Sequence, residues 1–148
     1  MPRRPLIHHE ITQSIIAAFY ETYNTLGFGF LEHVYMAALE RELRARGHSV
    51  AREMWVTVFY KGEPLKKQRL DMVVDEKVIV EGKSTVELRK HALRQLQNYL
   101  FATEFQVGLL LHFGPEPKVH RLVSTRAVRA TAAPDVTAES HVSFGSGC

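Results

Sequence analysis

The chain has 148 residues and a mass of 16.9 kDa, a size that fits one domain. Its apolar content of 45% and charged content of 24% exclude a wholly disordered protein. The net charge of +3 permits a nucleic-acid partner without requiring one, and the single cysteine, Cys148, excludes an internal disulfide and a cysteine zinc site. No apolar run is long enough for a signal peptide or a membrane span, so we expect a cytoplasmic protein with no membrane contact.

The first half of the chain changes its hydrophobic period once. Residues 7–26 and 31–46 carry apolar side chains at helical spacing and predict two amphipathic helices, separated by a glycine-containing loop. Residues 53–60, 67–74 and 77–83 are rich in β-branched types and predict three strands.

The second half predicts a helix over 86–102, with Ser84 or Thr85 as its N-cap, and then strands at 106–113 and 118–124. The resulting order, ααβββαββ, favours an α/β fold with a mixed sheet of four or five strands and helices on its faces. Ala, Thr, Ser, Pro and Gly dominate the end of the chain. We therefore expect one domain over 1–125 and a weakly ordered C-terminal tail over 126–148.

Two acidic residues stand out because they lie in segments that otherwise read as buried strands. These are Asp71 and Glu81, and Lys83 follows Glu81 by two residues. A charge in an apolar strand is costly unless it is paired or binds a metal ion. Glu81 and Lys83 lie on the same face, because side chains alternate along a strand.

The length of the turn after Val74 decides whether the two acids meet. A two-residue turn pairs Val74 with Lys77 and puts Asp71 and Glu81 on opposite faces. A three-residue turn pairs Val74 with Val78 and puts the two acids directly opposite each other. Opposed carboxylates repel, so the second register makes sense chiefly if a divalent cation bridges them.

Three motifs resemble those of a known nuclease superfamily. The residues Asp71…Glu81-Gly82-Lys83 resemble the PD-(D/E)XK signature, although Leu70 stands where the name-giving motif has proline. The segment Gln95–Tyr99 resembles the QxxxY motif of the RecB-like branch, and Gly29–Tyr35 matches the GxxExxY motif of a small bacterial family in that superfamily. The match covers about residues 7–124 and implies a restriction-endonuclease-like core.

This resemblance implies a nuclease that uses Mg²⁺ or Mn²⁺ to hydrolyse phosphodiester bonds, with DNA as the expected substrate. Asp71, Glu81 and the backbone carbonyl of Gly82 would bind the cation, which would leave the side chain at position 82 free to vary. Glu32 would complete or steer the metal site through water.

The remaining residues of the motifs would act beside the cation. Lys83 would orient or help deprotonate the attacking water and offset charge on the phosphate. Gln95 and Tyr99 share a helix face and would hold Lys83, the nucleophile or a substrate phosphate.

Each candidate also has a purely structural interpretation. Asp71 could pair with Arg69 or Lys67, Glu81 and Lys83 could form a solvated edge, Glu32 could interact with the helix dipole, and Gln95 and Tyr99 could be an ordinary polar pair. The whole protein could be an inactive nuclease-fold module that binds nucleic acid or a partner protein, or an assembly subunit. A homodimer is plausible because a core this small has little surface to wrap a duplex.

Other residues give weaker signals. We expect His8 and His9 to be solvated, His112 and His120 to be structural, and Trp55, Phe59 and Tyr60 to belong to the core. Six cationic residues flank the acidic pair in sequence and could contact a phosphate backbone or form a solvated face, namely Lys66, Lys67, Arg69, Arg89, Lys90 and Arg94.

Overall fold

The computed structural model describes residues 6–124, so the expected C-terminal tail lies outside the described residues. The elements are α1 (His9–Leu26), α2 (Glu32–Ala45), β1 (Val50–Tyr60), β2 (Glu63–Val74), β3 (Val78–Lys83), α3 (Lys90–Ala102), β4 (Val107–Phe113) and β5 (Pro117–Val123). This is the predicted order.

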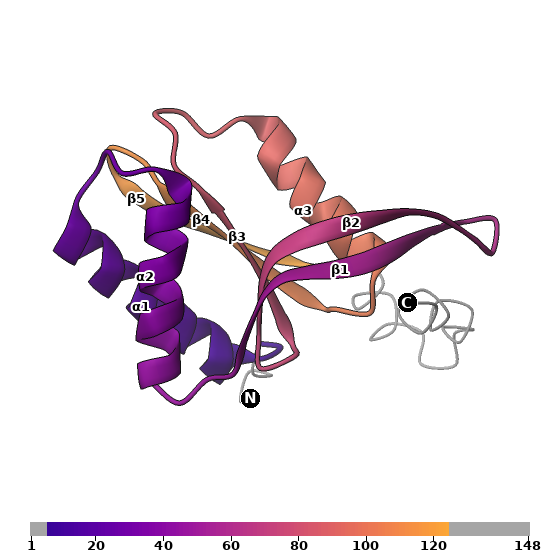
Figure 1. The fold of residues 1–148 in the computed structure, drawn as a ribbon, viewed down its shortest axis with the longest axis horizontal. Helices are drawn as coiled ribbons and strands as arrows, with labels where there is room; N and C mark the ends of the chain where they lie inside the picture. Colours follow the sequence, from indigo (N-terminus) through magenta and orange to yellow (C-terminus); the bar gives the residue numbers. More distant parts are fainter. Residues whose placement is uncertain (1–5, 125–148) are drawn as a thin grey trace, which may run out of the picture.

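The strands form one five-stranded mixed sheet in the order β1-β2-β3-β4-β5 (Figure 1). β3 and β4 are parallel, as expected when helix α3 connects them, and the other neighbours are antiparallel. The predicted α/β architecture, with a mixed sheet between helices, is therefore confirmed, and it is consistent with the restriction-endonuclease-like fold.

Helices cover both faces of the sheet (Figure 1). On one face, α1 and α2 pack over a core in which the Tyr35 and Phe113 rings stack with centroids 4.3 Å apart. On the other face, α3 packs through Leu96 and Leu100 against Ile79 and Leu110. No helix within residues 6–124 is both long enough and apolar enough to cross a membrane.

A glycine loop fixes the start of α2. Gly27 and Gly29 have φ angles of 77° and 118°, which side-chain-bearing residues rarely adopt. The Tyr35 hydroxyl donates a hydrogen bond to the Gly27 carbonyl and accepts one from the Phe30 N–H. The tyrosine of the GxxExxY pattern thus holds the loop that leads into the first turn of α2, where Glu32 lies.

The predicted start of the third helix was wrong. α3 begins at Lys90 and not near residue 86, and neither expected cap residue caps it. Ser84 Oγ donates to the Phe30 carbonyl at 2.6 Å, and Thr85 Oγ1 donates to the Glu87 carbonyl at 2.8 Å. Both hydroxyls serve the loop after β3, which Ser84 ties to the loop before α2.

Two aromatic residues assigned to the core were also placed wrongly. Trp55 and Tyr60 are each 58% exposed. Both belong to β1, as predicted, but Trp55 pairs with Arg69 and Tyr60 with Glu63, beyond the last β2–β3 pair at Met72. In the described part of the chain, no third strand lies beside this part of the hairpin, so the two rings stay exposed.

Candidate active site

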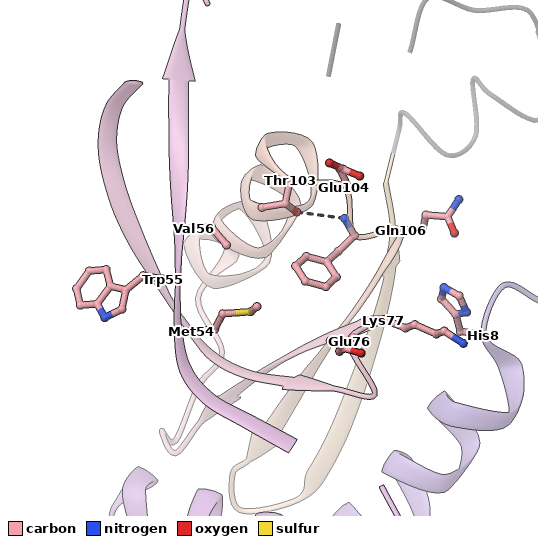
Figure 2. Close-up of a pocket in the computed structure, with 10 residues that line it drawn as sticks. His8, Met54, Trp55, Val56, Glu76, Lys77, Thr103, Glu104 and Gln106 are labelled. Carbon is pink, nitrogen blue, oxygen red and sulfur yellow. Dashed lines mark hydrogen bonds between the residues drawn. The ribbon is translucent and has the colours of Figure 1, made fainter. Parts of the chain in front are cut away.

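A cavity of about 460 Å³ lies between β1, the β2–β3 turn and the α3–β4 loop (Figure 2). Its lining includes His8, Met54, Glu76, Lys77 and Gln106. None of the sequence-predicted site residues lines this cavity. The predicted carboxylates lie instead at the end of the β2–β3 hairpin away from its turn.

The hairpin between β2 and β3 adopts the longer turn of the two that the sequence allowed. Val74 pairs with Val78, and the Lys77 N–H donates to the Val74 carbonyl at 3.0 Å. Asp75 and Glu76 have φ angles of 52° and 57°, so the turn needs two left-handed residues. This register brings Asp71 opposite Glu81.

The β2–β3 ladder ends where the two acids meet. Its last pair is Met72 with Val80, while β3 stays paired with β4 through Lys83. Beyond that pair, side chains replace the backbone ladder: the Asp71 N–H donates to Glu81 Oε2 at 3.0 Å, and the Gly82 N–H donates to Asp71 Oδ2 at 3.4 Å. The two carboxylates therefore bridge β2 and β3 at the point where the strands separate.

Glu81 is an unusually buried carboxylate, 6% exposed. Burial and the negative charge of Asp71 raise the pKa of Glu81 to about 8, although its hydrogen bond from Asp71 and the charge of Lys83 act in the opposite direction. A carboxyl group with this pKa is largely protonated at neutral pH unless a positive charge joins it.

Glu32 and Lys83 lie within electrostatic reach of this pair. Burial and the charge of Asp71 raise the pKa of Glu32, while Lys83 lowers it. Three elements thus direct charge toward one place: Glu32 from the start of α2, Asp71 from β2, and Glu81 with Lys83 from the end of β3.

Helix α3 adds Tyr99 to the site. Burial and the charges of Glu81 and Asp71 raise the pKa of the Tyr99 hydroxyl, which donates to Gln68 Oε1 at 3.4 Å. Gln95 is partly buried one turn earlier on α3. No hydrogen bond described within residues 6–124 joins Gln95 to the carboxylates or to Lys83, so its part in the site stays a prediction.

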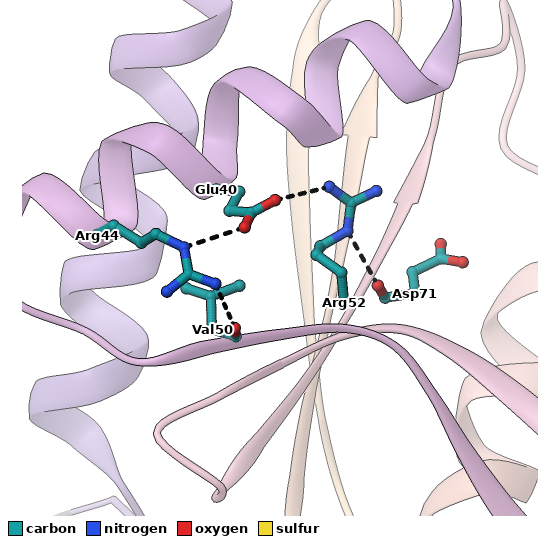
Figure 3. Close-up of polar contacts among 5 residues, drawn as sticks. All are labelled: Glu40, Arg44, Val50, Arg52 and Asp71. Atoms are coloured by element: carbon teal, nitrogen blue, oxygen red, sulfur yellow. Dashed lines mark hydrogen bonds and ion pairs between the residues drawn. The ribbon is translucent and has the colours of Figure 1, made fainter.

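Polar contacts that the sequence did not predict hold the backbone of Asp71 (Figure 3). Arg52 of β1 donates from Nε to the Asp71 carbonyl at 3.3 Å and from Nη1 to Glu40 Oε1 of α2 at 3.1 Å. Glu40 also accepts from Arg44, which donates to the Val50 carbonyl. In Figure 3 the Asp71 carboxylate points away from Arg52, so this network fixes the backbone and does not contact the acid group.

The expectation that the side chain at position 82 is free to vary was wrong. A Cβ atom at Gly82 would lie 2.5 Å from Sδ of Met36 on α2, and Met36 is 2% exposed. Any side chain here would force the buried Met36 to move, because α2 packs directly on the end of β3, next to Glu81.

His112 has the structural place that we expected. It pairs with Lys83 in the β3–β4 ladder, and its Nε2 lies 2.8 Å from the Thr85 carbonyl. His112 therefore holds the loop that follows Lys83.

The donor set fits a hard divalent cation in part. Carboxylate oxygens are the ligands such ions prefer. A cation would offset both the burial of Glu81 and the repulsion from Asp71, which together raise the pKa of Glu81. Within residues 6–124, however, no three His, Cys, Asp or Glu side chains lie close enough together to hold a metal ion directly. Two protein carboxylates with water completing the shell are the usual arrangement for Mg²⁺.

Comparison with known proteins agrees with this geometry. The family model of the PD-(D/E)XK nuclease superfamily matches residues 9–123, which include both helices around the glycine loop, the acidic pair and α3. No curated protein and no solved structure matches the chain significantly. The chain belongs to the PD-(D/E)XK nuclease superfamily.

Proposed function

We propose that this protein is a metal-dependent nuclease that cuts DNA, and that it belongs to the GxxExxY family within the RecB-like branch. The observation that carries the proposal is the opposed pair Asp71 and Glu81, placed where β2 and β3 separate. A protein that needed these residues only for stability would gain little from two carboxylates that repel each other.

We infer that Asp71, Glu81 and the Gly82 carbonyl hold Mg²⁺ or Mn²⁺, with Glu32 acting through water. The bound ion would supply Lewis acidity toward the phosphodiester and toward water. The peptide N–H groups of Asp71 and Gly82 keep the two acids in register through their hydrogen bonds to Glu81 and Asp71.

Lys83 would act on the attacking water and on the phosphate. Its ammonium group follows Glu81 on the same face of β3 and offsets the negative charge of both glutamates. Tyr99 donates a hydrogen bond beside the carboxylates, and Gln95 would orient Lys83 or a phosphate from the same helix.

One observation favours a second candidate, a nuclease-fold module that binds nucleic acid or a partner protein without cutting. Within the described residues no ready-made group of three ligand side chains exists, so metal binding depends on water and on Glu32. Weak metal affinity of the parent protein would favour this candidate.

A cleavage assay on labelled single- and double-stranded DNA and RNA, with Mg²⁺, Mn²⁺ or EDTA, tests the proposal. We expect cutting that needs metal and stops in EDTA. Absence of cutting with either ion, together with no calorimetric binding of Mn²⁺ at millimolar concentration, would leave the binding module as the better assignment.

Two variants then separate the roles of the residues. Asp71→Ala should lose Mn²⁺ binding and cleavage together, because it removes a ligand. Lys83→Ala should keep Mn²⁺ binding and lose cleavage, because lysine acts on water and phosphate. A Lys83→Ala protein that cuts as fast as the parent would show that Lys83 is a surface charge.

A further inference from the structure

Strands β1 and β2 run on past the rest of the sheet as a two-stranded arm, residues 54–69 (Figure 1). β2 pairs with β3 only from Met72 onward in the described structure, whereas its pairing with β1 continues to Glu63. Every residue of β2 from Glu63 to Arg69 is exposed. Within the arm, Val56 and Thr57 of β1 are buried, and Val56 packs in the core beneath α3. The β2 side and the tip of the arm therefore offer a long surface that the core does not use.

The arm starts at the candidate active site. Gln68 accepts the hydrogen bond from Tyr99, whose pKa the charges of Glu81 and Asp71 help to raise. At about 3.4 Å per residue, the arm carries β2 roughly 30 Å away from Asp71 to its tip. A polynucleotide strand with stacked bases covers that length with about ten nucleotides.

The exposed side chains of the arm combine positive charge with aromatic rings. Near the tip, Lys61, Lys66 and Lys67 are exposed, and Glu63 is the one acidic residue between them in the sequence. The Trp55 ring lies on the side of β1 opposite Met54 and Val56 (Figure 2) and is 58% exposed, as is Tyr60. Cations that follow a phosphate backbone and rings that stack on unpaired bases are the two parts of a single-strand binding surface.

A lysine-rich edge also argues against the main alternative use of such an arm. An open edge strand invites pairing with a second copy, and exposed lysines and proline are the residues that prevent it. β2 carries Pro64, Lys66 and Lys67 along this segment. The arm is therefore better suited to a nucleic acid than to another strand.

We infer that the β1–β2 arm binds a single-stranded segment of the substrate and directs it to the carboxylate pair. This inference rests on the proposed nuclease function and adds the form of nucleic acid that the site receives. Lys67 lies on the face of the arm that carries Trp55, and Lys66 lies on the opposite face. The phosphates therefore lie along the outer edge of β2, which both long lysine side chains reach, with Lys61 at the tip, and unpaired bases stack on Trp55.

Tryptophan fluorescence tests the inference directly, because Trp55 is the single tryptophan of the chain. The full-length protein is titrated with oligo(dT) of 20 nucleotides in EDTA, so that no cutting occurs. We expect saturable quenching, and weaker competition by a blunt duplex of the same length. Saturating binding measured by anisotropy without any change in Trp55 fluorescence would overturn the inference, as would equal competition by the duplex.

Charge reversal gives a matched control. Lys66→Glu with Lys67→Glu should weaken oligo(dT) binding at least tenfold. The slope of log K against log salt concentration should become shallower by about 0.7 for each lost phosphate contact. Lys77→Glu with Lys118→Glu makes the same change in net charge at two exposed lysines outside the arm, and should weaken binding less than threefold. Equal losses in both proteins would show that net charge alone attracts the strand. Circular dichroism melts check that both variants fold.

Strand length separates the arm from the site. The arm variant should lose affinity for oligo(dT) of 12 nucleotides and keep the parent's weak affinity for four, because four nucleotides do not reach the lysines. A parent that binds through the arm but never cuts would contradict the nuclease proposal and leave the arm inference standing. A parent that cuts DNA, with arm and control variants that bind oligo(dT) equally well, would support the nuclease proposal and contradict the arm inference. Loss of self-association in the arm variant, with unchanged oligo(dT) affinity, would assign the arm to a second copy.

Discussion

Both ends of the β2–β3 hairpin hold buried or half-buried acids, but the two surroundings shift the pKa of these acids in opposite directions. At the turn, Asp75 lies 2.6 Å from His48 Nδ1 and accepts the Ser49 N–H at 2.9 Å. Partial burial raises the pKa of Asp75, but the hydrogen bonds from His48 and Ser49 outweigh it and hold the pKa below its ordinary value. The hydrogen-bonding needs of the Asp75 carboxylate are therefore met by residues of the fold itself.

At the open end, Asp71 and Glu81 face each other, with Glu32 also within electrostatic reach. Burial and neighbouring negative charge raise the pKa of both glutamates. The turn acid ties elements together, since His48 also lies 2.6 Å from Ser14 Oγ of α1. Asp71 and Glu81 also accept backbone hydrogen bonds, but these leave the pKa of Glu81 raised. The contrast teaches that the partners of a structural acid lower its pKa, whereas the surroundings of an acid kept for a ligand leave its charge uncompensated.

The largest expected effect comes from exchanging one charge at each end. Asp71→Asn should lower DNA cleavage by about 10³-fold, the upper range for one electrostatic group, and leave the melting temperature equal or higher. The amide can still accept the Gly82 N–H, and a repulsion is removed. Cleavage assays and thermal melts measure both quantities.

Asp75→Asn is the matched substitution on the same strand pair. It should cost about 1–3 kcal/mol of stability by weakening the contacts to His48 and Ser49, and cleavage per folded molecule should stay at the parent level. If Asp75→Asn loses activity while fully folded, or Asp71→Asn unfolds, the division between a structural and a functional end is wrong.

The second prediction concerns pH. Unfolded Glu81 ionises near its ordinary pKa of 4.5, and folded Glu81 near 8. Between these values the folded protein holds more protons than the unfolded one, so stability without metal should fall as pH rises from about 4.5 to 8 and then level off. The change is on the order of a few kcal/mol, at 1.4 kcal/mol per unit. Urea denaturation across this range measures it.

Glu81→Gln should remove most of that decline and be more stable than the parent at pH 8. The turn end has the opposite sign: the stability from Asp75 is complete above its unfolded pKa and is lost as pH falls through the lower folded value. Parent and Glu81→Gln proteins with the same pH profile above pH 4.5 would contradict the raised pKa.

The third prediction concerns the helix that closes the open end. Gly82→Ala should destabilise the protein by about 1–3 kcal/mol, because the new methyl group forces Met36 to move within a packed core. Met36→Ala, which leaves a cavity, should restore room for it. The double variant should therefore be more stable than the sum of the single losses predicts, and chemical denaturation of all four proteins measures the coupling. Simple additivity would show that the contact is soft.

The fold could be predicted largely from the sequence, because its signals are local. Helical spacing located α1 and α2, and the count of residues in the turn after Val74 left two registers, of which the structure has the one that joins Asp71 and Glu81. The start of α3 could not be located from the sequence, because Ser84 and Thr85 do not cap the helix. Their hydroxyls donate to the carbonyls of Phe30 and Glu87, both of which lie in loops.

What the sequence could not provide depends on contacts between distant elements. The preference for glycine at position 82 arises from Met36 on another element, and the exposure of Trp55 depends on where the sheet ends. The network of Arg52, Glu40 and Asp71 gave one local signal, the i, i+4 spacing of Glu40 and Arg44. That spacing is so common on helices that it does not identify a site.

The smallest expected effect comes from that network. Arg52→Ala removes the donor to the Asp71 carbonyl and the ion pair with Glu40, both partly exposed, so the stability loss should be about 1 kcal/mol. Arg52 contacts only the backbone of Asp71, so it positions the acid without touching the reacting atoms. We expect cleavage to fall a few-fold through kcat, with KM for DNA unchanged.

Arg52→Lys and Glu40→Gln separate positioning from net charge. Lysine keeps the charge but cannot donate to Glu40 and the Asp71 carbonyl from one rigid planar group, so it should behave like alanine in kcat. Glu40→Gln keeps an oxygen for Arg52 and should lose less. If Arg52→Lys restores full kcat, the positive charge matters and the geometry does not. A rise in KM for DNA would instead show that Arg52 contacts the substrate. The substrate-binding surface at the open end of the hairpin would then extend to the face of the sheet that α2 covers.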